Sequence, residues 1–412
     1  MNTTTTARQF PEADSAGEPV GTRRIRAGLR LLIASAAVAG LAVAAPTASA
    51  APVRGDHAAA RRVLDRAVAG GGVPGILARI QDGRETWVGS AGVADTETGR
   101  PRRAQDRFRI GSTTKTFTAT VMLQLEAEHR LGLDDPVEKW LPGVVRGPGY
   151  EPEKITIRQL LNHTSGIYDY VNDEVMRERG TGTPFLEHRF DTYRPEEIVR
   201  IGLAHPPGFA PGTDWGYSNT PYFLAGMIIE RVTGRPLADA FAQRIARPLG
   251  LTATYLPRGD EQVIRGPHGR HYSKLMLTTP DAAVYDVTEL DSSWGWAAGG
   301  VVSTTGDLDR FFGALLGGRL LPPAQQREMF TMVPTKNWIP DTAYGLGVAS
   351  QELSCGVTVW GMGGAINGSW TYTFGNRNGT RMVSVNSNGD WNQPIVAFTD
   401  LLQAEFCPGT TE

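Results

Sequence analysis

The order of apolar and polar residues first predicts structure near the start of the chain. Ala58 to Ala69 have the apolar spacing of a helix. Two short runs with strand character follow, Ile76 to Ile80 and Trp87 to Gly89, on either side of a turn at Asp82-Gly83. The pattern therefore predicts a helix followed by a β-hairpin.

The middle of the chain has helical periodicity. Apolar residues repeat at helical spacing from Phe117 to Leu125, so Ser112 stands where a helix begins. From about residue 135 to residue 290 the chain is rich in proline, glycine and short helical segments. The clearest of these segments are Pro221 to Val232 and Pro236 to Ala246.

Strand-like runs return after Trp294. They are Gly345 to Val348, Val357 to Trp360, Ser369 to Phe374 and Met382 to Val385, and a last helix is predicted from Pro394 to Phe406. Because strands occupy both ends of the chain and helices its middle, we expect an α/β (α+β) fold with one sheet. Residues 51–111 and 295–412 would form the sheet region, and residues 112–294 an inserted helical region.

The first 50 residues have the features of an export signal. The arginines at 23, 24, 26 and 30 lead into the apolar stretch Leu31 to Ala45, and Ala48-Ser49-Ala50 offers small residues where a signal peptidase would cut. This stretch is shorter than the roughly 20 residues that a membrane-spanning helix needs. We therefore expect a secreted protein that is cleaved near Ala50 and keeps no membrane anchor. The pair Arg23-Arg24 leaves the twin-arginine route open.

Composition and charge restrict the partners. The chain of 412 residues is 41% hydrophobic, enough for a sizeable core. Without residues 1–50 it has 36 basic and 40 acidic residues, a formal net charge of -4, so we expect no nucleic-acid partner. The two cysteines, Cys355 and Cys407, can pair in the oxidising environment that an exported protein meets. Two unrelated buried thiols are the alternative.

Ser112 and Lys115 are candidates for a nucleophile and its base. They lie three residues apart, so they share a helix face. Only 5 of the 41 basic residues are lysines, which makes a chance Ser-x-x-Lys uncommon in this chain. A serine hydroxyl needs a base to accept its proton, and a lysine serves when its pKa is lowered. The structural alternative is that Ser112 is a helix N-cap.

Deacylation requires a second group that handles protons. Tyr217-Ser218-Asn219 is a candidate, since a phenol can relay protons and an amide can bind a substrate carbonyl. Tyr170-Val171-Asn172 matches the same pattern equally well.

Signatures of other enzyme classes are missing. The sequence has no Gly-x-Ser-x-Gly elbow, no His-Glu-x-x-His helix and no phosphate-binding loop. His163 follows a predicted helix, and we expect it to be structural. We therefore expect neither a metal nor an organic cofactor.

Ser-x-x-Lys followed about a hundred residues later by Tyr-Ser-Asn resembles the serine beta-lactamase and penicillin-binding protein family, most closely its secreted DD-carboxypeptidase/transpeptidase branch. Phrases such as "LLNHTSGIYDY" (160–170), "YGLGV" (344–348) and "ELSCGVTVWG" (352–361) extend the resemblance over nearly all of the chain after residue 50. It implies a beta-lactamase/transpeptidase-like fold with an antiparallel sheet flanked by helices. It also implies that Cys355 and Cys407 are paired.

The resemblance assigns roles to the candidate residues. Ser112 would attack the substrate carbonyl, Lys115 would accept its proton, Tyr217 would relay protons and Asn219 would orient the acyl group. The amides of Ser112 and Ala365 would form the oxyanion hole, and Trp294 would be a wall of the cleft, with a core aromatic as the alternative.

The third motif of the family, His/Lys-Thr/Ser-Gly, is replaced here by Met362-Gly363-Gly364. The hydroxyl that helps to hold a substrate carboxylate is lost at Gly363, and a carboxylate-binding arginine of the closest branch falls at Ala349. A carboxylate that enters such a pocket loses its hydration without replacement. A neutral leaving group therefore suits the site better.

We accordingly expect a serine acyl-enzyme hydrolase that acts on a small-molecule or peptide substrate, such as a cell-wall peptide or a beta-lactam, and is a monomer. Two rivals are an esterase/amidase and a transacylase that passes the acyl group to an amine. A third is a non-catalytic penicillin-binding or cell-wall-binding protein.

Overall fold

The computed structural model describes residues 57–69, 72–391 and 394–407. The predicted export signal, residues 1–50, lies outside the described residues. Among the helices of the described ranges, none has the length and apolarity that crossing a bilayer requires.

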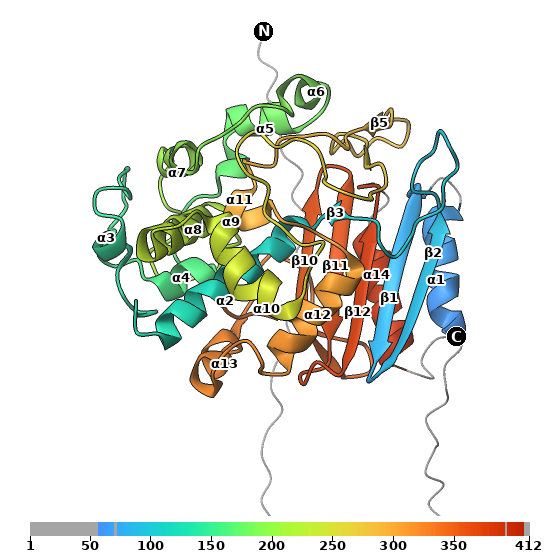
Figure 1. The fold of residues 1–412 in the computed structure, drawn as a ribbon. Helices are drawn as coiled ribbons and strands as arrows, with labels where there is room; N and C mark the ends of the chain where they lie inside the picture. Colours follow the sequence, from blue (N-terminus) through green and yellow to red (C-terminus); the bar gives the residue numbers. More distant parts are fainter. Residues whose placement is uncertain (1–56, 70–71, 392–393, 408–412) are drawn as a thin grey trace, which may run out of the picture. The chain divides into compact units, whose positions relative to one another are not determined.

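An eight-stranded antiparallel sheet forms the centre of the fold, and both ends of the chain contribute to it (Figure 1). Neighbouring strands follow the order β2-β1-β12-β11-β10-β9-β8-β7. The strands are β1 Gly75–Asp82, β2 Glu85–Gly92, β7 Val333–Pro334, β8 Thr342–Tyr344, β9 Ala349–Glu352, β10 Thr358–Ile366, β11 Ser369–Gly375 and β12 Arg381–Ser387. Pairing of β1 with β12 joins the first hairpin to the last strand, so the predicted assembly of one sheet from both ends is confirmed.

Helices cover both faces of the sheet, which explains why its central strands are buried on both sides. Helices α1 and α14 pack on each other and on the sheet, whereas α12 packs on β1, β11 and β12. The inserted helices gather beside the sheet in Figure 1. The helices are α1 Ala58–Val68, α2 Thr114–Ala127, α3 Val137–Trp140, α4 Ile157–Leu161, α5 Glu174–Gly180, α6 Pro184–His188, α7 Pro195–Leu203, α8 Thr220–Thr233, α9 Leu237–Phe241, α10 Arg247–Leu249, α11 Trp296–Gly299, α12 Thr305–Leu316, α13 Pro323–Met329 and α14 Pro394–Phe406.

Most predicted elements are confirmed, with one clear error. The predicted strand Gly345 to Val348 is wrong, because these residues form the turn between β8 and β9. The Gly345 amide donates to the Val348 carbonyl at 2.8 Å, and Gly347 has a φ of 72°, which glycine adopts easily. The predicted helix Pro236 to Ala246 is α9 continued by a π-helical turn, Ala242–Ala246.

Two pairs of short strands lie outside the central sheet. Strand β3, Phe108–Arg109, pairs with β6, Val302–Ser303, and these strands lead into α2 and α12. Strand β4, Tyr272–Ser273, pairs with β5, Tyr285–Asp286. The first pair ties the segment that precedes Ser112 to the segment that follows α11.

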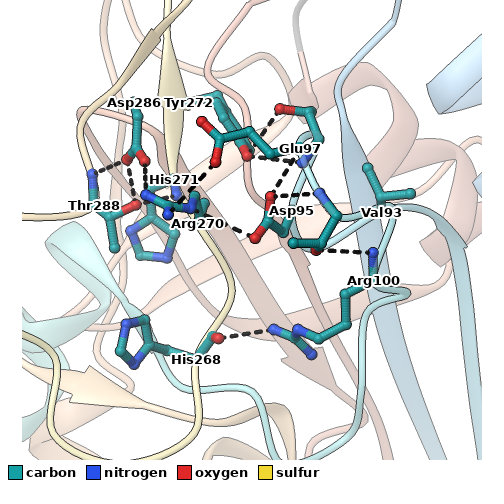
Figure 2. Close-up of polar contacts among 12 residues, drawn as sticks. Val93, Asp95, Glu97, Arg100, His268, Arg270, His271, Tyr272, Asp286 and Thr288 are labelled. Atoms are coloured by element: carbon teal, nitrogen blue, oxygen red, sulfur yellow. Dashed lines mark hydrogen bonds and ion pairs between the residues drawn. The ribbon is translucent and has the colours of Figure 1, made fainter.

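Figure 2 shows charged side chains that connect the loop after β2 to the chain around the β4–β5 hairpin. The Arg270 guanidinium contacts Asp95 at 3.6 Å and Glu97 at 3.8 Å, and it also pairs with Asp286. Across the same region, Arg100 donates to the His268 carbonyl at 2.7 Å. These ion pairs and the hydrogen bond from Arg100 connect the two loops.

A disulfide joins Cys355, in the turn between β9 and β10, to Cys407 after α14, with a Cα–Cα distance of 5.9 Å. The pairing implied by the family resemblance is confirmed, and the alternative of two free thiols is wrong. The bond fixes α14 to the sheet.

Candidate active site

Ser112 lies in a single 3₁₀ turn, Gly111–Thr113, that runs directly into α2. Neither the turn nor α2 has a side-chain cap, so the interpretation of Ser112 as an N-cap is wrong. Gly111 has a φ of 51°, a left-handed conformation that residues with a Cβ rarely adopt. This sharp turn leaves the Ser112 hydroxyl to bond with Lys115 instead of with the backbone.

The Lys115 amine donates three hydrogen bonds. Its acceptors are Ser112 Oγ at 3.0 Å, Asn219 Oδ1 at 2.7 Å and the Ala298 carbonyl at 2.9 Å. The side chain is fully buried, and burial lowers the pKa of Lys115 to about 7, although the charge of Asp169 opposes this change. A substantial fraction of the amine is therefore neutral at physiological pH and can accept the Ser112 proton.

Asp169 completes the support of Lys115 and was missed in the sequence. Asn219 Nδ2 donates to the two Asp169 carboxylate oxygens at 3.2 and 3.1 Å, and the Asn219 backbone amide donates to Oδ1 at 3.0 Å. Burial raises the pKa of Asp169, whereas the Asn219 backbone amide and the charge of Lys115 act in the opposite direction. The only signal in the sequence was its position beside Tyr170, because no local spacing links Asp169 to a residue fifty positions away.

The Tyr217 side chain interacts with the Ser112 side chain, and this interaction opposes the rise in the Tyr217 pKa. The centroid of the Tyr217 ring lies 4.9 Å from Lys115 Nζ, and the ring stacks on Trp338 with a centroid distance of 5.6 Å. Burial raises the pKa of Tyr217 well above 10, so the phenol keeps its proton. The environments thus separate two functions, with Lys115 suited to accept a proton and Tyr217 suited to donate one.

His163 packs behind Tyr217, with the ring centroids 4.4 Å apart. Its Nδ1 accepts a hydrogen bond from the Ser218 amide at 3.3 Å, which favours the tautomer protonated on Nε2. Burial and the nearby charge of Lys115 lower the pKa of His163 well below its usual value, so the ring is neutral. It fixes the backbone between Tyr217 and Asn219.

Tertiary structure distinguishes the two Tyr-x-Asn copies. Tyr217 and Asn219 lie at Lys115, whereas the Tyr170 hydroxyl donates to the Trp294 carbonyl and Asn172 is exposed to solvent. The copy at Tyr170 to Asn172 therefore lies beside the site and does not supply a partner for Ser112.

Strand β10 forms the other side of the site. A Cβ at Gly364 would lie 2.1 Å from the Ile110 carbonyl oxygen and 2.5 Å from the Ser112 nitrogen. Likewise, a Cβ at Gly111 would lie 2.6 Å from the Ala365 nitrogen. Because Gly111 and Gly364 have no side chains, β10 lies directly against the turn that carries Ser112. The backbone amides of Ser112 and Ala365 both lie where the strand and the turn meet. Their role as an oxyanion hole stays a prediction.

The remaining third-motif residues do not offer a carboxylate a partner. Gly363 lies opposite Tyr372 on β11, and a Cβ at Gly363 would lie 2.3 Å from the Tyr372 ring. Met362 is 1% exposed and packs in the main core, so its side chain is not presented to a substrate. Ala349, which occupies the expected arginine position, is buried opposite Gly361.

Trp294 is half-buried and lines a cavity together with Tyr170, Phe185 and Asn367. It packs both on the main core and on a small second apolar cluster that includes Phe185 and Ile366. The structure thus places Trp294 at a cavity wall.

The described residues contain no group of three or more acidic, histidine or cysteine side chains arranged to hold a metal ion. The chemistry that the site itself offers is an attacking hydroxyl, a partly neutral amine and a protonated phenol within contact of one another. These groups suit acyl transfer from an ester or an amide.

Comparison with known proteins adds independent findings. A family model described as Beta-lactamase matches residues 60–405. The esterase EstB of Burkholderia gladioli is 39% identical over 165 residues, which cover 39% of this chain and 41% of that protein. Penicillin-binding protein 4* of Bacillus subtilis is 30% identical over 277 residues, which cover 64% of this chain and 56% of that protein. The chain therefore spans about half the length of these curated relatives.

Solved structures match over more of their length. A D-stereospecific amidohydrolase from Streptomyces sp. is 48% identical with a TM-score of 0.79, and the match covers 86% of this chain and 99% of that chain. The D-amino acid amidase of Ochrobactrum anthropi SV3, complexed with L-phenylalanine amide, is 28% identical with a TM-score of 0.73. That match covers 84% of this chain and 97% of the other.

Proposed function

The chain belongs to the beta-lactamase family of serine hydrolases, and on this basis we propose that it is an amidohydrolase that cleaves amides and esters of D-amino acids. One observation carries the proposal: a buried lysine with a pKa of about 7 bonds to the hydroxyl of Ser112 at 3.0 Å. This arrangement supports attack by serine on a carbonyl carbon at neutral pH.

Acylation begins when Ser112 Oγ bonds to the substrate carbonyl carbon and Lys115 Nζ accepts the hydroxyl proton. The Ser112 and Ala365 amides stabilise the negative oxygen that forms. As the bond to the leaving group breaks, Tyr217 supplies a proton to the departing amine and is reprotonated from Lys115. A water molecule then attacks the acyl-enzyme, and the same groups return the proton to Ser112.

The choice of a neutral leaving group rests on the third motif. Gly363 offers a substrate carboxylate no side-chain hydroxyl, and the buried Ala349 provides no positive charge. Removing a carboxylate from water without a compensating partner is costly. This argument favours simple amides and esters over a peptide that ends in D-alanine, so we expect weak DD-carboxypeptidase activity.

The D-stereospecific preference is supported by similarity to the two solved amidases. One of them is described as a D-stereospecific amidohydrolase and is 48% identical over almost its whole length. The other is described as a D-amino acid amidase. We extend that preference to this chain as part of the proposal.

Matched substrates test the proposal. Purified protein should release ammonia from D-phenylalaninamide faster than from its L enantiomer, and Ser112→Ala should abolish the reaction. Release of D-alanine from an acyl-D-Ala-D-Ala peptide should be slower than either D-amide or D-ester hydrolysis. A faster reaction with the L enantiomer, or with the peptide, would overturn the corresponding part of the proposal. Adding an amine acceptor measures how much of the acyl-enzyme undergoes transfer instead of hydrolysis.

We also propose that the protein acts outside the cell as a monomer. The composition of residues 1–50 supports export. N-terminal sequencing of protein from the culture medium should find a start near residue 51, and light scattering should give the mass of one chain. An intact N-terminus or a larger assembly would refute these expectations.

A further inference from the structure

Tyr217 lies in the loop that precedes α8, and the segment after α4 holds this loop through its backbone. The Gly216 amide donates to the His163 carbonyl at 3.0 Å, and the Gly212 amide donates to the Thr164 carbonyl at 2.8 Å. These bonds fix the path of the loop, but they leave the Tyr217 side chain free to rotate about its own bonds. The position of the phenol therefore depends on what packs against its ring.

The turn between β7 and β8 supplies such a contact. Trp338, from this turn, stacks on Tyr217 with the ring planes 15° apart and the centroids 5.6 Å apart. The Trp338 ring also packs on Trp215 and on Tyr344, in both cases at a centroid distance of 5.7 Å. Trp338 thus contacts two aromatic residues of the Tyr217 loop, and one of them is the candidate proton donor.

A second contact joins the turn to the same loop. The Lys336 ammonium donates to Asp214 at 2.7 Å, and the Asp214 carboxylate accepts the Trp215 amide at 2.8 Å. Asn337 and Asp341 have φ values of 51° and 56°, a left-handed conformation that asparagine and aspartate adopt more readily than most residues. The Lys336–Asp214 pair is largely exposed and adds little stability by itself. It does set the turn against the loop at a point next to Trp215.

Trp338 reaches the reacting groups only through Tyr217. The Tyr217 ring centroid lies 4.9 Å from Lys115 Nζ, and the Tyr217 side chain interacts with Ser112. Among the hydrogen bonds and ring contacts of the described residues, none joins Trp338 to Ser112 or Lys115. Any effect of Trp338 on the reaction is therefore transmitted by the phenol.

We propose that Trp338 is a positioning residue, which holds the Tyr217 phenol where it can protonate the leaving group. The inference rests on the proposed function and adds to it one residue outside the reacting set. When the C–N bond of an amide substrate breaks, Tyr217 Oη gives its proton to the departing nitrogen and takes a proton from the Lys115 ammonium. A reacting group that is misplaced by about 1 Å costs about 100-fold in rate. Loss of the stacked ring allows a displacement of this kind.

The leaving group separates a positioning role from a structural one. The nitrogen of D-phenylalaninamide needs a proton to leave, whereas p-nitrophenolate leaves D-phenylalanine p-nitrophenyl ester without one. Trp338→Ala should therefore lower kcat/KM by about 100-fold for the amide and leave the ester value within about twofold. Both rates come from one sample, so incomplete folding lowers them equally and does not change their ratio.

Three comparisons sharpen the test. Trp338→Phe keeps a ring that can stack, so it should restore most of the amide-to-ester ratio. Trp140→Ala is the matched control, because Trp140 is also half-buried but its Nε1 bonds to Asp135 at 3.1 Å, and the ratio should not change. Adding Trp338→Ala to Tyr217→Phe should lower the amide rate no further, because the proton donor is already absent.

An unchanged amide-to-ester ratio in Trp338→Ala would overturn the inference while the hydrolase proposal stands. A further loss of amide hydrolysis in the double variant would do the same, because the effect of Trp338 would then not pass through Tyr217. Failure of the wild-type protein to hydrolyse every D-amide and D-ester would instead reject the proposed function itself.

Discussion

Replacing Asp169 by asparagine should shift the pH dependence of acylation to lower pH. Lys115 must be neutral to accept the Ser112 proton, so kcat/KM should rise with pH through the Lys115 pKa of about 7. The Asp169 charge stabilises the protonated amine and therefore raises this pKa. Removing the charge with an isosteric amide should lower it further.

The size of the shift follows from the geometry. Lys115 Nζ and the Asp169 carboxylate are separated by the side-chain amide of Asn219, with hydrogen bonds of 2.7 and 3.1 Å at its two ends. Two unit charges on the order of 8 Å apart interact by about 2 kcal/mol at an effective dielectric constant near 20. That energy corresponds to about 1.5 pKa units, so we expect the acid limb of the profile to move down by about 1 to 2 pH units.

The assay measures kcat/KM for D-phenylalaninamide between about pH 4 and pH 9, in steps of about half a pH unit. This range extends to both sides of a pKa near 7. Asp134→Asn makes the same change in net charge on a carboxylate that is 73% exposed, and it should leave the profile in place. Thermal unfolding of both variants shows whether they fold. An acid limb that stays where it is, or moves to higher pH, would refute the electrostatic coupling between Asp169 and Lys115.

Three further variants test other parts of the site and fold. Tyr217→Phe keeps the stacked ring but removes the proton donor, so kcat should fall about 100- to 10,000-fold in steady-state assays; unchanged kcat would contradict the proton-transfer role. Gly364→Ala places a Cβ 2.5 Å from the Ser112 nitrogen, so labelling by a fluorophosphonate and the Tm should both decrease, and normal labelling would argue against the tight contact. Reduction of the bond between Cys355 and Cys407, which are 52 residues apart, should lower the free energy of unfolding by about 4 kcal/mol in a urea titration, and an unchanged midpoint would contradict this.

Local pattern was sufficient where the relevant interactions are local. The helix Ala58–Val68 and the helix Thr220–Thr233 follow from apolar spacing within each segment, and the strands β10 to β12 from alternation and β-branched residues. Local pattern alone also gave the wrong prediction of a strand from Gly345 to Val348. The apolar residues of this segment are buried, but they are buried in a turn that the glycines allow.

The site was only partly readable from sequence. Ser112 and Lys115 are three residues apart, so one helical turn is enough to bring them together. Local pattern alone did not choose Tyr217 over Tyr170. The family resemblance favoured Tyr217, and the structure places the loop that carries Tyr217 at Lys115 of α2. Asp169 was also invisible to local pattern.

The sequence by itself determined the periodicities of the major elements, the pairing of Ser112 with Lys115 and the loss of the third-motif hydroxyl at Gly363. Only the tertiary structure decided that Lys115 is fully buried and that its pKa falls to about 7. It also decided which tyrosine faces Ser112 and where an aromatic cavity lies. The physical reason is that burial and long-range electrostatics depend on segments far apart in the chain, whereas spacing along one turn of helix depends only on neighbours.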